Sequence, residues 1–227
     1  MWGRILIFSC VLPWPTAGAA PWVQDDDAWY ARMSVGFDVG EGLQGYRSDA
    51  YFEYGWSETW TVTLKGEAVS YSDASDFDSN GWRVTARRLL YDGDAINVSA
   101  EFGLLQGSAI GGRNGCERLG AEARAGVSWS GEWREQSTFA FVEGVGRFHG
   151  GCERQRLELG YGVETFRSIW TVTQFWSERG ASDAKSDKIQ TELMWRADFA
   201  DVSAGYRYEV GNAFQEEGIF LAIAKVF

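Results

Sequence analysis

The sequence is poor in residues that build metal sites: among 227 residues it has one histidine, His149, and three cysteines. One cysteine, Cys10, falls in a short apolar run near the start, which leaves Cys116 and Cys152. A zinc site usually has four nitrogen, sulfur or carboxylate ligands, so the sequence indicates no metal, and we expect no other cofactor. The net charge of −11 lacks the basic excess that nucleic-acid binding requires, so we expect no nucleic-acid partner.

The chain also has no long hydrophobic run. Its compact apolar stretch, Ile5 to Leu12, is far shorter than the ~20 residues that a membrane-spanning helix needs. Arg4 precedes this stretch and the small residues 17–19 follow it, which is the pattern of a secretory signal peptide. We predict that residues 1–19 are a signal peptide and that residues 20–27 form a periplasmic N-terminal segment. If the remaining chain crosses a membrane, it must do so as a closed β-barrel.

The remaining residues, 28–227, alternate between apolar and polar side chains with a period of two. Ala31 and Met33 share one parity, for example, whereas Arg32 and Ser34 share the other. This pattern is typical of a strand with one apolar and one polar face. About twelve such segments of about ten residues follow one another, and a strand of that length spans the apolar band of a membrane. The predicted fold class is all-β: a single antiparallel up-and-down transmembrane β-barrel of about 12 strands.

The predicted connections alternate in length. Tight turns are expected at 57–58, 92–93, 167–168 and 200–201, and longer polar loops at 40–48, 72–80, 107–115, 178–187 and 211–217. Short periplasmic turns that alternate with longer outer loops are typical of outer-membrane barrels. Several tryptophans flank the tight turns and are expected to form an aromatic girdle at the membrane interface: Trp56, Trp60, Trp129, Trp133 and Trp170.

The last nine residues, Ile219 to Phe227, alternate and end on an aromatic residue. With this ending, residues 28–227 resemble the Gram-negative outer-membrane β-barrel proteins as a class. The resemblance implies that Phe227 is an assembly signal read by the barrel-assembly machinery. It also implies an outer-membrane location, in contact with lipid and lipopolysaccharide. Lys225 departs from the class, but a lysine at the rim can extend its ammonium into water.

The polar parity carries many charges, and a lipid-facing Arg or Lys would cost ~2–4 kcal/mol, so we expect this set to face the lumen. Two interpretations stay open: a narrow porin-like channel for small polar or cationic solutes, and a plugged structural or adhesion barrel of an envelope complex without transport. Acidic residues in the predicted outer loops favour cations: Asp73, Asp76, Asp78, Asp183, Asp187, Glu216 and Glu217. The expected lumen-lining residues are Arg32, Glu53, Lys65, Glu67, Arg83, Arg87, Glu101, Glu122, Arg124, Arg156, Glu158, Glu164, Glu192, Arg196, Arg207 and Glu209.

Cys116 and Cys152 both fall near the edges of predicted outer loops, and two cysteines in a secreted chain favour a disulfide. The strands that carry them are two steps apart, so the loop ends must lean together to bring the two Cα atoms within ~7 Å. His149 could serve a lipid hydrolase at the outer rim together with Ser108 or Ser182, but neither serine lies in a motif. We therefore expect no enzyme activity.

Overall fold

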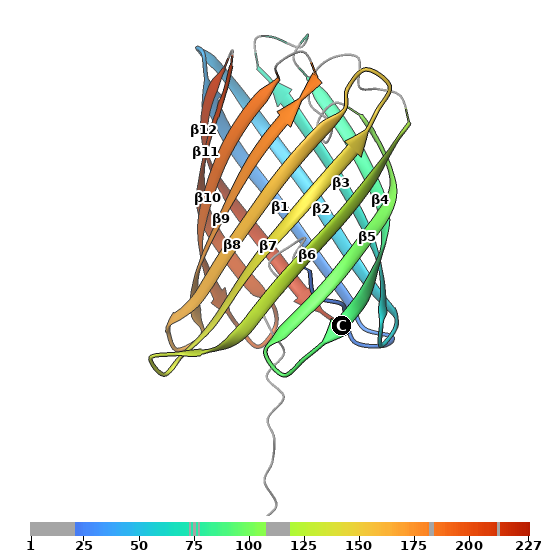
Figure 1. Ribbon diagram of the computed structural model, residues 1–227. Coiled ribbons are helices and arrows are strands. Elements are labelled where there is room, and N and C mark those ends of the chain that lie inside the picture. Colours follow the sequence, from blue (N-terminus) through green and yellow to red (C-terminus); the bar gives the residue numbers. More distant parts are fainter. Residues whose placement is uncertain are drawn as a thin grey trace, which may run out of the picture.

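The computed structural model describes residues 21–72, 74, 76, 78–107, 119–181, 184–212 and 214–227. These residues form a closed barrel of antiparallel strands in which each strand pairs with its sequence neighbours and β1 pairs with β12 (Figure 1). Among them no helix is long and apolar enough to cross a membrane. The predicted fold class is thus confirmed. The strands are β1 (Trp29–Gly40), β2 (Leu43–Ser57), β3 (Trp60–Tyr71), β4 (Ser79–Asp92), β5 (Ile96–Gly107), β6 (Gly120–Trp133), β7 (Gln136–Phe148), β8 (Arg154–Phe166), β9 (Ile169–Gly180), β10 (Lys185–Arg196), β11 (Asp201–Gly211) and β12 (Gln215–Val226).

The two ends of the barrel differ in their connections. At the end where β1 begins and β12 finishes, the links between strands are residues 58–59, 93–95, 134–135, 167–168 and 197–200. We call this the turn end; it is the lower end in Figure 1. The opposite end, here called the loop end, carries the other connections, among them 72–78 and 149–153.

One predicted loop is wrong. The segment 40–48 was expected to be a long outer loop, but β1 and β2 continue through it and only Glu41 and Gly42 connect them. Both residues have positive φ angles, 48° and 80°. Two such residues form the tight turn whose twist matches that of antiparallel strands. The polar residues of the segment therefore belong to strand ends rather than to a loop.

The two faces of the barrel wall have opposite character. Leu64, Phe102 and Leu193 are exposed on the outer face, as a lipid-facing surface requires, whereas Arg87 and Glu101 on the inner face are buried. Adjacent side chains of a strand point to opposite faces, so the alternation in the sequence becomes an apolar outside and a charged inside.

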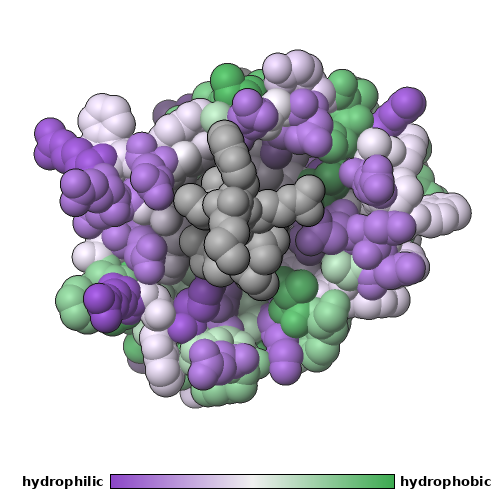
Figure 2. Space-filling view, turned by 90° about the horizontal axis from the view of Figure 1, so that it is seen from below, coloured by the Kyte–Doolittle hydropathy of each residue, from purple (hydrophilic) through white to green (hydrophobic). Residues whose placement is uncertain are grey.

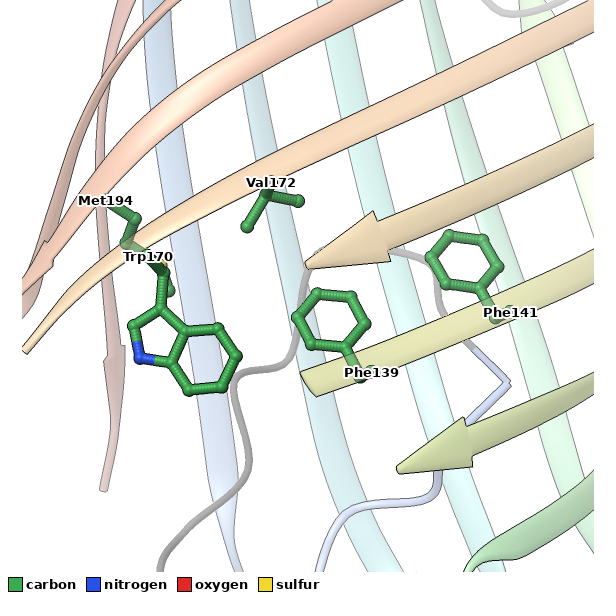
Figure 3. Close-up of a cluster of buried hydrophobic side chains, with 5 residues drawn as sticks. All are labelled: Phe139, Phe141, Trp170, Val172 and Met194. Atoms are coloured by element: carbon green, nitrogen blue, oxygen red, sulfur yellow. The ribbon is translucent and has the colours of Figure 1, made fainter. Parts of the chain in front are cut away.

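A patch of apolar side chains interrupts the charged interior near the turn end. Phe139 and Phe141 of β7 lie beside Trp170 and Val172 of β9 and Met194 of β10, all buried inside the barrel (Figure 3). The rings of Phe139 and Trp170 stack with centroids 6.0 Å apart. We call these five residues the aromatic patch.

Trp170 corrects the predicted aromatic girdle, because it lies inside the barrel and only 4% of it is exposed. The sequence Trp-Thr-Val-Thr occurs at both 60–63 and 170–173. The first copy starts on the first residue of β3 and the second on the second residue of β9. A shift of one residue moves every side chain to the other face, so Thr61 points inward in β3 and Trp170 points inward in β9. Trp56 and Trp133 are exposed on the outside, as a girdle requires.

Candidate functional site

The candidate site is the charged interior of the barrel, because the strand alternation places all of the predicted lumen residues on the inner parity. Six of them remain partly exposed: Lys65, Glu67, Arg156, Glu164, Arg196 and Glu209. The others are buried: Arg32, Glu53, Arg83, Arg87, Glu101, Glu122, Arg124, Glu158, Glu192 and Arg207. A charge without a partner is costly to bury. The ion pairs among these side chains therefore determine which charges of the interior remain to interact with a solute.

Glu122 is the centre of the ion pairs on the wall formed by β4 to β9. Its carboxylate lies 3.0 Å from Nη1 of Arg83, 2.7 Å from Nε of Arg124 and 2.6 Å from Nε of Arg147. A second glutamate nearer the loop end, Glu178, has the same role. Three arginines approach it: Arg154 at 2.6 Å, Arg156 at 2.7 Å and Arg147 at 3.5 Å. Carboxylates are therefore shared among arginines in this part of the wall.

The balance reverses one step closer to the turn end. Arg87 donates from Nε to Glu101 and from Nη1 to Glu53, each over 2.9 Å. Nη1 of Arg124 lies 2.6 Å from Glu143 and 3.9 Å from Glu158. Glu143 and Glu158 lie directly opposite each other on β7 and β8, a pairing that is unfavourable unless a cation lies between them. Here arginines are shared among carboxylates.

The opposite wall, around β1, carries a smaller network that is centred on Arg47. This arginine lies 2.9 Å from Asp38, 2.7 Å from Glu67 and 2.8 Å from Glu216. Asp38 also accepts from Arg207. One arginine thus joins carboxylates of β1, β3 and β12, and Arg207 and Lys65 each pair with one of the same carboxylates.

The N-terminal segment 21–27 enters the barrel from the turn end. The backbone N–H of Gln24 donates to Oγ1 of Thr61 over 2.8 Å, and its side-chain amide donates to Glu53 over 2.5 Å. Nη1 of Arg87 donates to the carbonyl of Trp22 over 2.6 Å. The indole of Trp22 packs edge-on against the aromatic patch, with its centroid 5.4 Å from that of Phe139. The segment therefore occupies part of the barrel interior.

Gly55 shows how closely this segment approaches the wall. A Cβ at this position would overlap the carbonyl of Asp25. Two backbone hydrogen bonds of 2.9 Å, from Asp27 to Gly55 and from Gly55 to Ala28, hold the segment at the rim. Figure 2 shows this end of the barrel, where hydrophilic residues gather at the rim.

Several interior charges were missed by the sequence interpretation. Arg47 fell in the segment predicted as the first loop, and Glu178 and Glu216 fell in other predicted loops. Glu143 and Arg147 lie in β7, where large residues at both parities hid the period. The signal that could have found them is the parity itself, continued past the apparent end of each strand.

Two other predicted features lie at the loop end. His149 is fully buried, and a Cβ at Gly120 would overlap its ring, so the ring covers this glycine. Cys116, Ser108 and Ser182 lie outside the described residues, as do the signal peptide and the acidic residues Asp73 and Asp183. The Cys116–Cys152 disulfide therefore stays a prediction.

No known family and no curated protein matches the sequence. The structure is similar to an outer-membrane channel from Pseudomonas putida, with a TM-score of 0.64 and 10% identity over 94% of this chain and 100% of that chain. It is also similar to the NanC porin, with a TM-score of 0.57 and 11% identity over 84% and 98% of the two chains. The KdgM porin gives a TM-score of 0.56 and 10% identity over 84% and 97%. At these identities the likeness concerns the fold, and the chain has the fold of the outer-membrane β-barrels.

Proposed function

We propose that the protein is an outer-membrane channel that passes small polar solutes through a narrow lumen lined by both signs of charge. The observation that carries the proposal is the closed barrel of twelve strands with an ion-paired polar interior. Twelve strands enclose more space than the roughly eight strands whose side chains just fill a barrel. Contact with lipid requires only an apolar outer face, whereas a polar interior suits the passage of polar solutes. The channels and porins of similar fold support this assignment.

In this proposal the turn end faces the periplasm and the loop end faces outward, since short turns are periplasmic in such barrels. Residues 1–19 are the signal peptide that brings the chain across the inner membrane, and Phe227 is the assembly signal. Lipid and lipopolysaccharide surround the outer face. The predicted lumen residues line the path of the solute.

The distribution of charge gives this channel a modest preference for cations. Asp38, Glu67 and Glu216 share Arg47 near the loop end, and Asp76 and Asp78 lie in a loop at the same end. Negative charge at a channel mouth raises the local concentration of cations. Ion pairing with Arg47, Arg207 and Lys65 balances the three inner carboxylates, so the preference rests on the loop aspartates and strong exclusion of anions is not expected.

The N-terminal segment makes the channel narrow at its periplasmic end. Trp22 and Gln24 lie inside the barrel, where they form hydrogen bonds with the wall and pack against its apolar side chains. A solute must pass beside this segment. The conductance should therefore be small for a barrel of twelve strands.

Single-channel recording of the mature chain in a planar bilayer tests the proposal. We expect small steps of conductance in potassium chloride and a reversal potential in a salt gradient that favours potassium. The variant Glu67→Gln should lose part of the preference for potassium, whereas Glu132→Gln, at an exposed position of β6 near the turn end, should keep it. A correctly folded barrel that never conducts would contradict the proposal.

A plugged barrel without transport is the second candidate. The low exposure of Arg87, Glu101 and Thr61, together with the inserted N-terminal segment, favours it. It predicts no conductance even when the segment is removed. We propose no enzymatic role, because a rim hydrolase would need His149 as its base and this side chain is 0% exposed.

A further inference from the structure

Arg83 differs from the other arginines of the β4–β9 wall in how its guanidinium is used. It is buried, with 2% of the residue exposed. Nη1 donates to Glu122 over 3.0 Å, whereas Nε and Nη2 have no hydrogen-bond partner among the described residues. By contrast, Arg87 uses all three nitrogens, on Glu101, Glu53 and Tyr51.

The two donors that Arg83 leaves over are those that recognise an oxyanion. Nε and Nη2 lie on one edge of the planar guanidinium, and two parallel N–H groups on such an edge match the two oxygens of a carboxylate or phosphate. Leaving buried donors of a charged group without an acceptor is costly. An acceptor with two oxygens would match both of these donors.

The charges around Arg83 favour an anion. Lys65 lies directly opposite on β3 and has a side chain that is 31% exposed, with its ammonium 3.1 Å from Glu67. Arg147 pairs with Glu122, as Arg83 does. Arg154 and Arg156 pair with Glu178, which lies nearer the loop end. These ion pairs join four arginines to two glutamates, so the loop-end half of this wall has an excess of positive charge.

We propose that Arg83 forms an oxyanion-binding site in the lumen, where Nε and Nη2 take the carboxylate or phosphate group of a solute and Lys65 supplies a second cation. The site rests on the proposed channel function for its access from outside, and because Nε and Nη2 are themselves buried, the guanidinium must turn toward the lumen to take this group. Glu143 and Glu158 lie deeper in the barrel, and their carboxylates repel the anionic group of a solute. The anionic end of the solute therefore binds at Arg83. The site thus selects a class of solute inside a channel whose overall preference is for cations.

Titration of the folded, full mature chain with inorganic phosphate by calorimetry tests the site without relying on conduction. We expect saturable binding at one site that chloride at equal ionic strength does not reproduce. Arg83→Lys keeps the charge but removes the two-donor edge and should weaken binding by about tenfold or more. Lys65→Gln should weaken it less, and acetate in place of phosphate shows whether a carboxylate suffices.

Arg179→Lys is the matched control, because Arg179 also pairs with a carboxylate, that of Asp187, but lies on the outer parity of β9 with a half-exposed side chain. It should bind phosphate like the unchanged protein. If the unchanged protein does not bind phosphate, or if Arg83→Lys and Lys65→Gln both bind it equally well, the site is wrong. Should Arg83→Lys fail to fold, the Lys65→Gln result alone decides.

Bilayer recordings separate this site from the proposed function. Phosphate added on the loop side should reduce the current through the unchanged protein and much less through Arg83→Lys. A barrel that binds phosphate but never conducts would retain the site and remove the channel. A barrel that conducts but neither binds phosphate nor responds to it would retain the channel and remove the site.

Discussion

Phe139 and Phe141 lie against two glycines of the neighbouring strand β8. A Cβ at Gly162 would overlap the ring of Phe139, and a Cβ at Gly160 would overlap the ring of Phe141. The glycines thus make room for the two rings against the inner wall.

Gly160→Ala should lower the free energy of unfolding by about 1–3 kcal/mol, because an overpacked methyl group forces the ring of Phe141 to move. Gly144→Ala is the matched control, since a Cβ there meets nothing within 4 Å. Urea unfolding of both variants in detergent checks this. Equal stability of the two variants would show that the ring moves freely.

Glu122 is the residue on which three buried arginines depend. Glu122→Gln keeps the shape of the side chain but removes the charge, so Arg83, Arg124 and Arg147 lose a shared partner. Breaking a buried ion pair from one side costs about 3–5 kcal/mol. We expect a loss of this order in urea unfolding, against a negligible loss in Glu132→Gln; a small loss in both would mean that water replaces the carboxylate.

His149 should make the loop end sensitive to acid. Burial, and then the positive charge of Arg147, lower the pKa of His149 below its ordinary value of 6.5. The unfolded chain therefore takes up a proton at a higher pH than the folded barrel does. Stability is fully present above the unfolded pKa and is lost as the pH falls below it.

Thermal unfolding at about pH 8 and about pH 5.5 tests this, because His149→Gln removes the proton-binding group. The melting temperature of the unchanged protein should fall more between the higher and the lower pH than that of His149→Gln does. A similar loss in both would assign the acid sensitivity to carboxylates elsewhere.

At the level of elements, the strands could be predicted and their contacts could not. The period of two gave all twelve strands, since lipid outside and charge inside force a strict alternation. It failed at β9, where Trp170 is apolar and inward, because the aromatic patch reverses the usual rule. It also ended strands too early, so Arg47 and Glu178 were missed.

The N-terminal segment shows the same limit. Residues 20–27 have no period, and the sequence predicted only a periplasmic N-terminal segment there. Residues 21–24 bind the interior through Thr61, Glu53 and the aromatic patch. Such contacts join positions 29 or more residues apart, and a pattern of neighbouring residues cannot reveal them.

Trp22→Ala should weaken the hold of this segment, because the indole fills the space beside Phe139 and Phe141. We expect larger or more frequent conductance steps in single-channel recordings than the unchanged protein gives. Trp29→Ala is the matched control, since Trp29 is exposed on the outer face. Conductance that rises equally in both variants would mean that the barrel as a whole has loosened.

At the level of the whole molecule, charge is sorted around and along the interior. The β4–β9 wall has more arginine near the loop end and more glutamate toward the turn end, and the wall around β1 balances carboxylates with cations near the loop end. A barrel that was only a rigid anchor would need no such order. A channel for polar solutes uses it to attract, hold and release charged groups.

The most direct test of the channel compares single-channel conductance of the mature chain with that of a chain from which residues 21–26 are deleted. Both chains should conduct, and the deleted chain should conduct more, because the segment narrows the periplasmic end of an otherwise open path. If both chains fold and insert into the bilayer and neither conducts, the interior is closed by its own side chains and the protein is not a channel.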